Sequence, residues 1–181
     1  MPQPWEENQQ WCEADLYFDF SRAVRVEKLD GSQHGLSHLM KSVDFLVEWE
    51  DQLWLIEVKD PENGSIPEQH RTERLLEFRA NLIGDTLINE HLFPKLRDSL
   101  LYLGLDEGIL NKPLRYLTII AVESLEVAEL EGLRNRLWQH AWVSGPPKRG
   151  WRKSFDVHAF NIGQWNRSFE GCPVIRISAV E

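Results

Sequence analysis

The segment 41–60, which reads KSVDFLVEWEDQLWLIEVKD, restricts the fold of this chain more than any other part of the sequence. Apolar residues alternate with other residues along 43–47 and again along 54–58, and this period of two is typical of β-strands. Glu50 and Asp51 lie between the two runs, where we expect a turn. The segment therefore predicts one antiparallel β-hairpin.

The register of this hairpin follows from the position of the turn. Pairing about the turn places Asp44 opposite Glu57 and Lys59 opposite Ser42, so three functional groups share one face and one end. Directly opposed side chains have Cβ atoms about 5 Å apart. Two carboxylates that close repel each other unless a positive charge lies between them or one of them is protonated. A divalent cation would satisfy this requirement.

The other face of the predicted hairpin is wholly apolar. It consists of Val43, Phe45, Val47, Trp54, Ile56 and Val58. We expect this face to be buried, which specifies the register, because a slip of one residue would bury both carboxylates.

Metal-assisted hydrolysis of a phosphodiester is the chemistry that uses such a group of residues. Carboxylate oxygens suit Mg²⁺ or Mn²⁺, so Asp44 and Glu57 are the predicted metal ligands, with the backbone carbonyl of Val58 as a third. The ammonium group of Lys59 emerges beside Glu57, where it can orient the attacking water and stabilise the charge that develops on the phosphate.

Asp44, twelve intervening residues and then Glu57-Val58-Lys59 resemble the signature of the PD-(D/E)XK nuclease superfamily. The sequence departs from the name-giving motif in having Val43 where proline would stand. The resemblance implies an additional acidic residue on a preceding helix. Its candidates are Glu13, Asp15, Asp19 and Glu27, of which we select Glu13.

The resemblance also implies the fold and the activity. The fold would be α/β, a restriction-endonuclease-like sandwich in which a central mixed sheet of about four or five strands is flanked by helices. The activity would be Mg²⁺-dependent cleavage of nucleic acid. In this superfamily the helix after the Glu-x-Lys strand often adds a polar residue to the site, and Gln69, Lys95 and Arg97 are the candidates for it here.

Periodicity outside the hairpin predicts an order of elements that agrees with this fold. Two helices are expected, at 68–83 and from Pro94 onward, and a third ends before Gly145. The later strands are expected at 114–122, 156–162 and 173–179.

The first forty residues give a weaker pattern. Leu16 and Phe20 fit a helix, which we expect to end near Ala23, although the same residues also fit a strand. His34 and His38 are interpreted as a pair of loop histidines near the substrate phosphate.

Length and composition set the outer bounds. The 181 residues, 42% of them hydrophobic, suffice for one α/β domain spanning 1–181. No apolar run is long enough to cross a membrane, so no membrane partner is expected. Cys12 and Cys172 lie far apart and form no recognisable motif, which favours a reducing, cytoplasmic location.

The charge distribution disfavours a protein that simply coats DNA. The net charge of −9 arises within residues 1–62, which hold 14 acidic and 5 basic residues. Basic residues instead gather in the segment 147–167, where Trp151 and Trp165 lie among them. We predict nucleic-acid contacts from Lys148, Arg149, Trp151, Arg152 and Lys153. The alternative is a solvated connector whose tryptophans pack into the core.

Two functions are consistent with the sequence. The first is a Mg²⁺- or Mn²⁺-dependent endonuclease acting in repair, restriction or defence, with DNA favoured over RNA as its substrate. The second is a catalytically silent module of the same fold that binds nucleic acid or a protein. A homodimer or a protein partner is compatible with either function.

Overall fold

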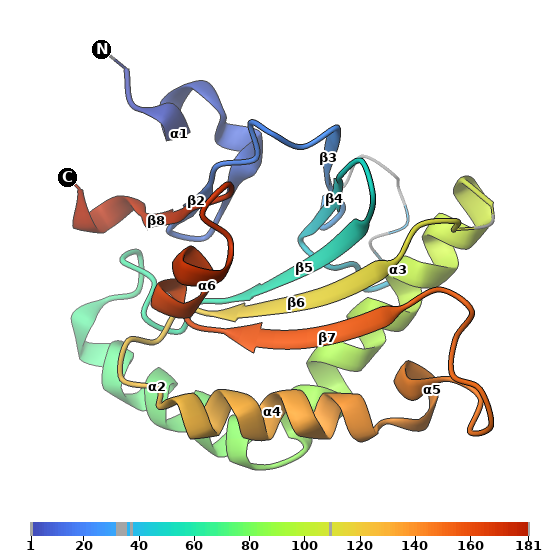
Figure 1. Cartoon of the computed structure of the whole chain (residues 1–181). Helices are drawn as coiled ribbons and strands as arrows, with labels where there is room; N and C mark the ends of the chain where they lie inside the picture. The colour runs from blue at the N-terminus through green and yellow to red at the C-terminus, as the bar shows by residue number, and fades with distance from the viewer. Residues whose placement is uncertain (1, 32–35, 37, 109, 181) are drawn as a thin grey trace.

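A computed structural model describes residues 2–31, 36, 38–108 and 110–180 of the chain. Its elements form two sheets and a set of helices (Figure 1). The strands are β1 (Cys12–Glu13), β2 (Leu16–Phe18), β3 (Arg25–Lys28), β4 (Phe45–Glu48), β5 (Leu53–Lys59), β6 (Leu114–Ile120), β7 (Phe155–Phe160) and β8 (Val174–Arg176). The α-helices are α1 (Pro4–Glu7), α2 (Glu68–Ile83), α3 (Phe93–Asp106), α4 (Val127–Gln139), α5 (Ala141–Ser144) and α6 (Ile162–Ser168). A π-helical stretch, η3 (Leu87–Leu92), leads into α3, and short 3-10 turns lie at η1 (Gln9–Trp11) and η4 (Ile177–Ala179).

The main sheet has five strands in the order β3-β4-β5-β6-β7. The first three pair antiparallel as a meander, whereas β6 and β7 join in parallel. The parallel joins need crossover connections, which α2, η3 and α3 supply between β5 and β6, and α4 and α5 supply between β6 and β7. The expected α/β architecture with a mixed sheet flanked by helices is thereby confirmed.

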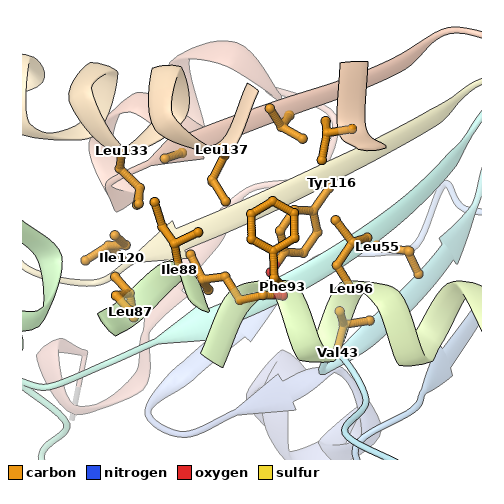
Figure 2. Packing of buried hydrophobic residues seen from close by; sticks show 14 of the residues in the cluster. Val43, Leu55, Leu87, Ile88, Phe93, Leu96, Tyr116, Ile120, Leu133 and Leu137 are labelled. Carbon is orange, nitrogen blue, oxygen red and sulfur yellow. The ribbon is translucent and has the colours of Figure 1, made fainter. Parts of the chain in front are cut away.

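Helices α2, α3 and α4 cover one face of this sheet. Figure 2 shows Leu96 of α3 and Leu137 of α4 packed against Leu55 and Tyr116 of the sheet. These four side chains are almost fully buried. Burying apolar area at about 25 cal/mol per Å² makes this cluster a main source of stability.

The opposite face is covered by a second sheet and a short helix. Strands β1, β2 and β8 form a three-stranded antiparallel sheet, and α6 lies beside it (Figure 1). Phe18 and Trp165 pack here against Phe45 and Trp54 of the hairpin, with ring centroids 5.3 to 6.0 Å apart. The main sheet is therefore buried on both faces.

The hairpin has the predicted register. Phe45 pairs with Ile56 and Val47 with Trp54, and the Trp49 N–H donates to the Gln52 carbonyl across the turn. The apolar face is buried as expected except for one detail. Val43 precedes β4 and packs in the cluster on the other side of the sheet, because the chain has left the strand geometry there.

The N-terminal prediction was wrong. The chain forms β1 and β2 where a helix ending near Ala23 was expected, and Leu16, Tyr17 and Phe18 are all buried. A strand forms here instead of a helix because β2 pairs with β8, which lies more than 150 residues later. The sequence patterns also missed β3 and α6. His34 lies outside the described residues, and His38 is exposed.

The later elements occur where periodicity placed them, with shorter strands. Helix α2 has the predicted bounds, β6 and β8 end earlier than expected, and α6 begins where the predicted strand 156–162 was to end. Within the described ranges, no helix combines the length and apolarity required to cross a membrane.

Candidate functional site

The hairpin brings Asp44 and Glu57 together at the end of the main sheet. Glu57 belongs to β5, and Asp44 directly precedes β4. The backbone N–H of Val58, the residue after Glu57, donates a hydrogen bond of 2.6 Å to Oδ2 of Asp44. Lys59 ends the same strand, and its Nζ lies 2.7 Å from Oε1 of Glu57. The three residues selected from the sequence thus lie at one place.

Both carboxylates are buried, which the sequence did not predict. Asp44 is 2% exposed and Glu57 is 0% exposed, although the hairpin has the register that was expected to keep them accessible. The cause is α3, which lies over this face. Ser99 of α3 is itself fully buried, and its Oγ accepts a hydrogen bond of 3.0 Å from the Val43 N–H next to Asp44.

A second lysine lies between the two carboxylates. Nζ of Lys95, at the start of α3, is 3.0 Å from Oε1 of Glu57 and 3.4 Å from Oδ1 of Asp44. The same ammonium is 3.5 Å from Oδ2 of Asp30. Burial alone would lower the pKa of Lys95, but the charges of Glu57 and Asp44 outweigh burial and raise it. Lys95 therefore carries the positive charge that the carboxylate pair requires.

The environment of Asp44 disfavours its charged form. Burial and the nearby charge of Glu57 raise the pKa of Asp44 to about 8. The charge of Lys95 and the hydrogen bond from the Val58 N–H act in the opposite direction. At neutral pH the pair thus carries less than two negative charges, and a stronger cation would be needed to ionise both groups.

A divalent cation suits the donor set at this end of the sheet. Oε2 of Glu57 is buried and has no hydrogen-bond partner in the described part of the chain, so it has unused capacity to coordinate. Across the described ranges, no three His, Cys, Asp or Glu side chains are grouped as a ready-made metal site. Two carboxylates are nevertheless sufficient protein ligands for Mg²⁺, which usually keeps several waters. The carbonyl of Val58 as third ligand stays a prediction.

Glu13, Gln69 and Arg97, three of the residues predicted to complete the site, have partners other than Asp44 and Glu57. Glu13 lies in β1 rather than on a helix, and its Oε2 pairs with Nζ of Lys28 at 2.8 Å. Its charge still contributes to the raised pKa of Asp44. Gln69 contacts His70 on an exposed part of α2, and Arg97 pairs with Asp98.

Lys95 is therefore the candidate that reaches the site. Asp30 and Ser99 were not identified from the sequence, because no local pattern relates residues so far apart along the chain to the hairpin.

Solvent reaches Lys59 but not the two carboxylates, which are buried. A hollow of about 360 Å³ is lined by Lys59, by Asp60, and by Arg74 and Asn81 of α2. Arg74 and Lys59 give it two cationic side chains, and Asp60 and Glu77 give it two acidic ones. The hollow has room for a phosphate group close to Lys59, whereas the carboxylates behind it are enclosed.

The predicted nucleic-acid contacts lie at the opposite end of the sheet. Residues 148–153 precede β7, and Phe155 at the start of β7 pairs with Leu114 at the start of β6 (Figure 1). Glu57 instead pairs with Thr118, four residues further along β6, which is about 13 Å away at the rise of a strand. Trp165 is fully buried in the core, whereas Trp151 is 47% exposed. The basic segment and the carboxylate pair are therefore two separate features.

Comparison with protein families, with curated proteins and with solved structures found no match to this chain.

Proposed function

We propose that this chain is a Mg²⁺-dependent nuclease of the PD-(D/E)XK type that cleaves phosphodiester bonds, with DNA favoured over RNA. The observation that carries the proposal is the contact between Asp44 and the strand segment Glu57-Val58-Lys59, in which the Val58 N–H binds Asp44 and Lys59 binds Glu57. A random Glu-x-Lys at the end of a strand would have no acidic partner in register across the hairpin.

The order of elements supports the proposal. An antiparallel meander of β3, β4 and β5 is followed by helices and then by β6, which pairs in parallel with β5. What the resemblance implies for a restriction-endonuclease-like core is a mixed sheet flanked by helices, and this order of elements agrees with it.

Each residue has a definite task in the proposed reaction. Asp44 and Glu57 would hold the cation, which when bound supplies a water of lowered pKa at neutral pH. Lys59 faces both Glu57 and the adjoining hollow, so its ammonium can orient a water and stabilise charge on a phosphate placed there. Arg74 lines the same hollow and can bind a neighbouring phosphate oxygen.

Lys95 would have to leave the pair for both carboxylates to hold a divalent cation. Its ammonium occupies the space between the carboxylates, and like charges would repel across a few Å. Asp30 is already 3.5 Å from the same Nζ and is partly exposed, so it can accept the displaced side chain. We infer that Lys95 would then pair with Asp30 alone.

The second candidate function is a catalytically silent binding module of the same fold. The observation that favours it is the same lysine: a partly buried ammonium within 3.4 Å of both carboxylates makes a complete ion-pair group without any metal. In such a protein Asp44, Glu57 and Lys95 would only stabilise the fold.

Two measurements separate these functions. Mg²⁺ or Mn²⁺ should raise the melting temperature of the native protein and leave that of Asp44→Ala unchanged, and equal shifts would contradict the metal site. Native protein with Mn²⁺ should cleave single-stranded, duplex or branched nucleic acid, and Lys59→Ala should not. Arg97→Ala is the matched control, because Arg97 is exposed and, among the described residues, forms its ion pair with its neighbour Asp98. If native protein and Lys59→Ala act at the same rate, the silent module is the correct function.

A further inference from the structure

The loop before β7 and the start of β6 enclose a cleft of about 520 Å³ at the end of the sheet remote from Asp44. Its floor is apolar and is formed by Leu100, Leu110, Leu114 and Phe155. Its rim is formed by Lys112, Arg149, Trp151, Arg152 and Lys153, with Ser154 beside them. The lining thus includes four cationic side chains and no acidic one, although the chain has a net charge of −9.

The cations of the loop are available to a ligand. Lys112 is engaged, because its Nζ binds Oε1 of Glu48 at 2.8 Å and the Trp49 carbonyl at 2.7 Å. Arg149, Arg152 and Lys153 are exposed, and the described part of the chain gives them no ion pair with an acidic side chain. Three uncompensated charges beside an apolar floor favour an anionic ligand with an apolar part.

The loop that carries these cations has a fixed shape. The Gly150 N–H donates to the Pro146 carbonyl at 2.8 Å, and Gly145 has a φ of +79°. A Cβ at Gly145 would lie 2.7 Å from the backbone nitrogen of Trp151, so only glycine fits there. The indole Nε1–H of Trp151 donates to the Val143 carbonyl at 3.0 Å, which fixes the ring at the rim. A preorganised surface of this kind loses little conformational entropy when it binds.

We propose that this cleft binds a short acidic peptide segment that carries a large apolar side chain. The apolar side chain would occupy the floor between Leu114 and Phe155, beside the indole of Trp151, and the acidic residues would pair with Arg149, Arg152 and Lys153. Aromatic residues and arginine, both present in this lining, are enriched at protein-binding surfaces.

Nucleic acid fits the cleft less well than a peptide does. Bases bind by stacking on aromatic side chains, and the floor of this cleft is formed largely by leucine. A long polyanion would also extend over the remainder of a chain that is strongly acidic, and a short peptide would not. The proposal does not depend on the nuclease function, because the cleft and the carboxylate pair lie at different ends of the sheet.

The test uses the full chain and a short fluorescent peptide of Asp and Glu with one central Phe. Fluorescence anisotropy should show saturable binding that weakens with salt, because the rim contacts are ionic. The same peptide with Ser in place of Phe should bind at least about tenfold more weakly, which corresponds to about 1.4 kcal/mol. Equal binding of both peptides would contradict a role for the apolar floor.

Charge reversal on the loop provides the matched comparison. The double variant Arg149→Glu with Lys153→Glu should weaken peptide binding by at least about tenfold. Lys148 belongs to the same exposed loop but does not line the cleft, so the variant Lys148→Glu should bind the peptide nearly as the native protein does. Equal losses in both variants, or no saturable binding by the native protein, would overturn the proposal. Tight binding of an oligothymidylate that the peptide cannot displace would assign the cleft to nucleic acid instead.

Discussion

The backbone N–H of Val58 donates a hydrogen bond of 2.6 Å to Oδ2 of Asp44. This bond joins the start of one hairpin strand to the end of the next and directs the Asp44 carboxyl toward Glu57. Since both side chains are enclosed by α3, the bond also holds an acidic group in a place where its charge is unfavourable. The protonation and stability of the protein should therefore depend on Asp44.

The free energy of unfolding should decrease as pH rises, because Asp44 loses its proton. Its pKa is about 8 in the folded protein against a value of 3.8 for an unperturbed aspartate. Between these values the folded state holds a proton that the unfolded state has released. The contribution to stability is therefore complete below about pH 4 and is lost as pH rises through about 8, by up to about 1.4 kcal/mol per pH unit.

Urea unfolding at several pH values measures this dependence. Asp44→Asn keeps an acceptor for the Val58 N–H but cannot ionise, so its stability should vary less with pH than that of the native protein. Asp30→Asn is the control, because Asp30 is half-exposed and contacts the same lysine. A native slope unchanged in Asp44→Asn would show that Asp44 does not titrate in this range.

Replacement of Lys95 should have opposite effects on stability and on metal binding. Lys95→Met removes the ammonium from a buried carboxylate pair and should destabilise the metal-free protein by about 3 kcal/mol. This cost is at the lower end of the range for such a loss, because Lys59 still pairs with Glu57. The same change removes the competing charge and should tighten Mn²⁺ binding by about tenfold.

Isothermal titration with Mn²⁺ and urea unfolding measure the two effects of Lys95→Met. Lys41→Met is the control, because the ammonium of Lys41 binds the Glu90 carbonyl rather than the carboxylate pair. Weaker Mn²⁺ binding by Lys95→Met would contradict the exchange of Lys95 for a cation, and would make Lys95 part of the binding site.

Arg176 should be a major contributor to the attachment of the small sheet. Its guanidinium lies 3.0 Å from Oδ1 of Asp60, 3.3 Å from Oδ2 of Asp15 and 2.8 Å from the Ala121 carbonyl. It therefore joins β8 to the ends of β5 and β6. Arg176→Met would leave the Asp60 carboxylate without its guanidinium partner, whereas Ser178 would still donate to Asp15, and should cost about 3 kcal/mol.

Urea unfolding checks this cost as well, with Arg167→Met as an exposed arginine nearby for comparison. Asp60 follows Lys59 directly, so loss of Arg176 should also lower cleavage by disturbing the hollow beside Lys59. A loss of stability no greater than that of Arg167→Met would show that the sheets are joined by apolar packing alone.

The sequence contained the information for the hairpin because that information is local. Alternation along 43–47 and 54–58 specifies two strands, and the turn at Glu50 and Asp51 specifies which residues face each other. The pairing of Asp44 with Glu57 and Lys59 follows from that register. The helices at 68–83 and from Pro94 could also be predicted, since an apolar stripe along a helix is a pattern of residues close together in the sequence.

The N-terminal region shows where local information fails. Leu16 and Phe20 fit a helix, whereas Leu16, Phe18 and Phe20 fit a strand. The strand forms because β8 supplies hydrogen bonds from the far end of the chain. The alternation of residues within one segment does not predict whether a distant segment will pair with it. The buried stack of Phe18 on Phe20, with centroids 5.4 Å apart, then completes the core on that face.

The sequence by itself determined the hairpin, its register and the identity of the residues at its end, because each depends on side-chain periodicity over a few residues. Only the tertiary structure decided what surrounds them. In the folded chain Lys95 lies between the carboxylates, and Asp44 and Glu57 are buried beneath α3. The basic loop with Trp151 lies at the opposite end of the sheet. These relations depend on how helices and distant strands pack over the hairpin, and packing between elements far apart in the chain leaves no periodic pattern in the sequence.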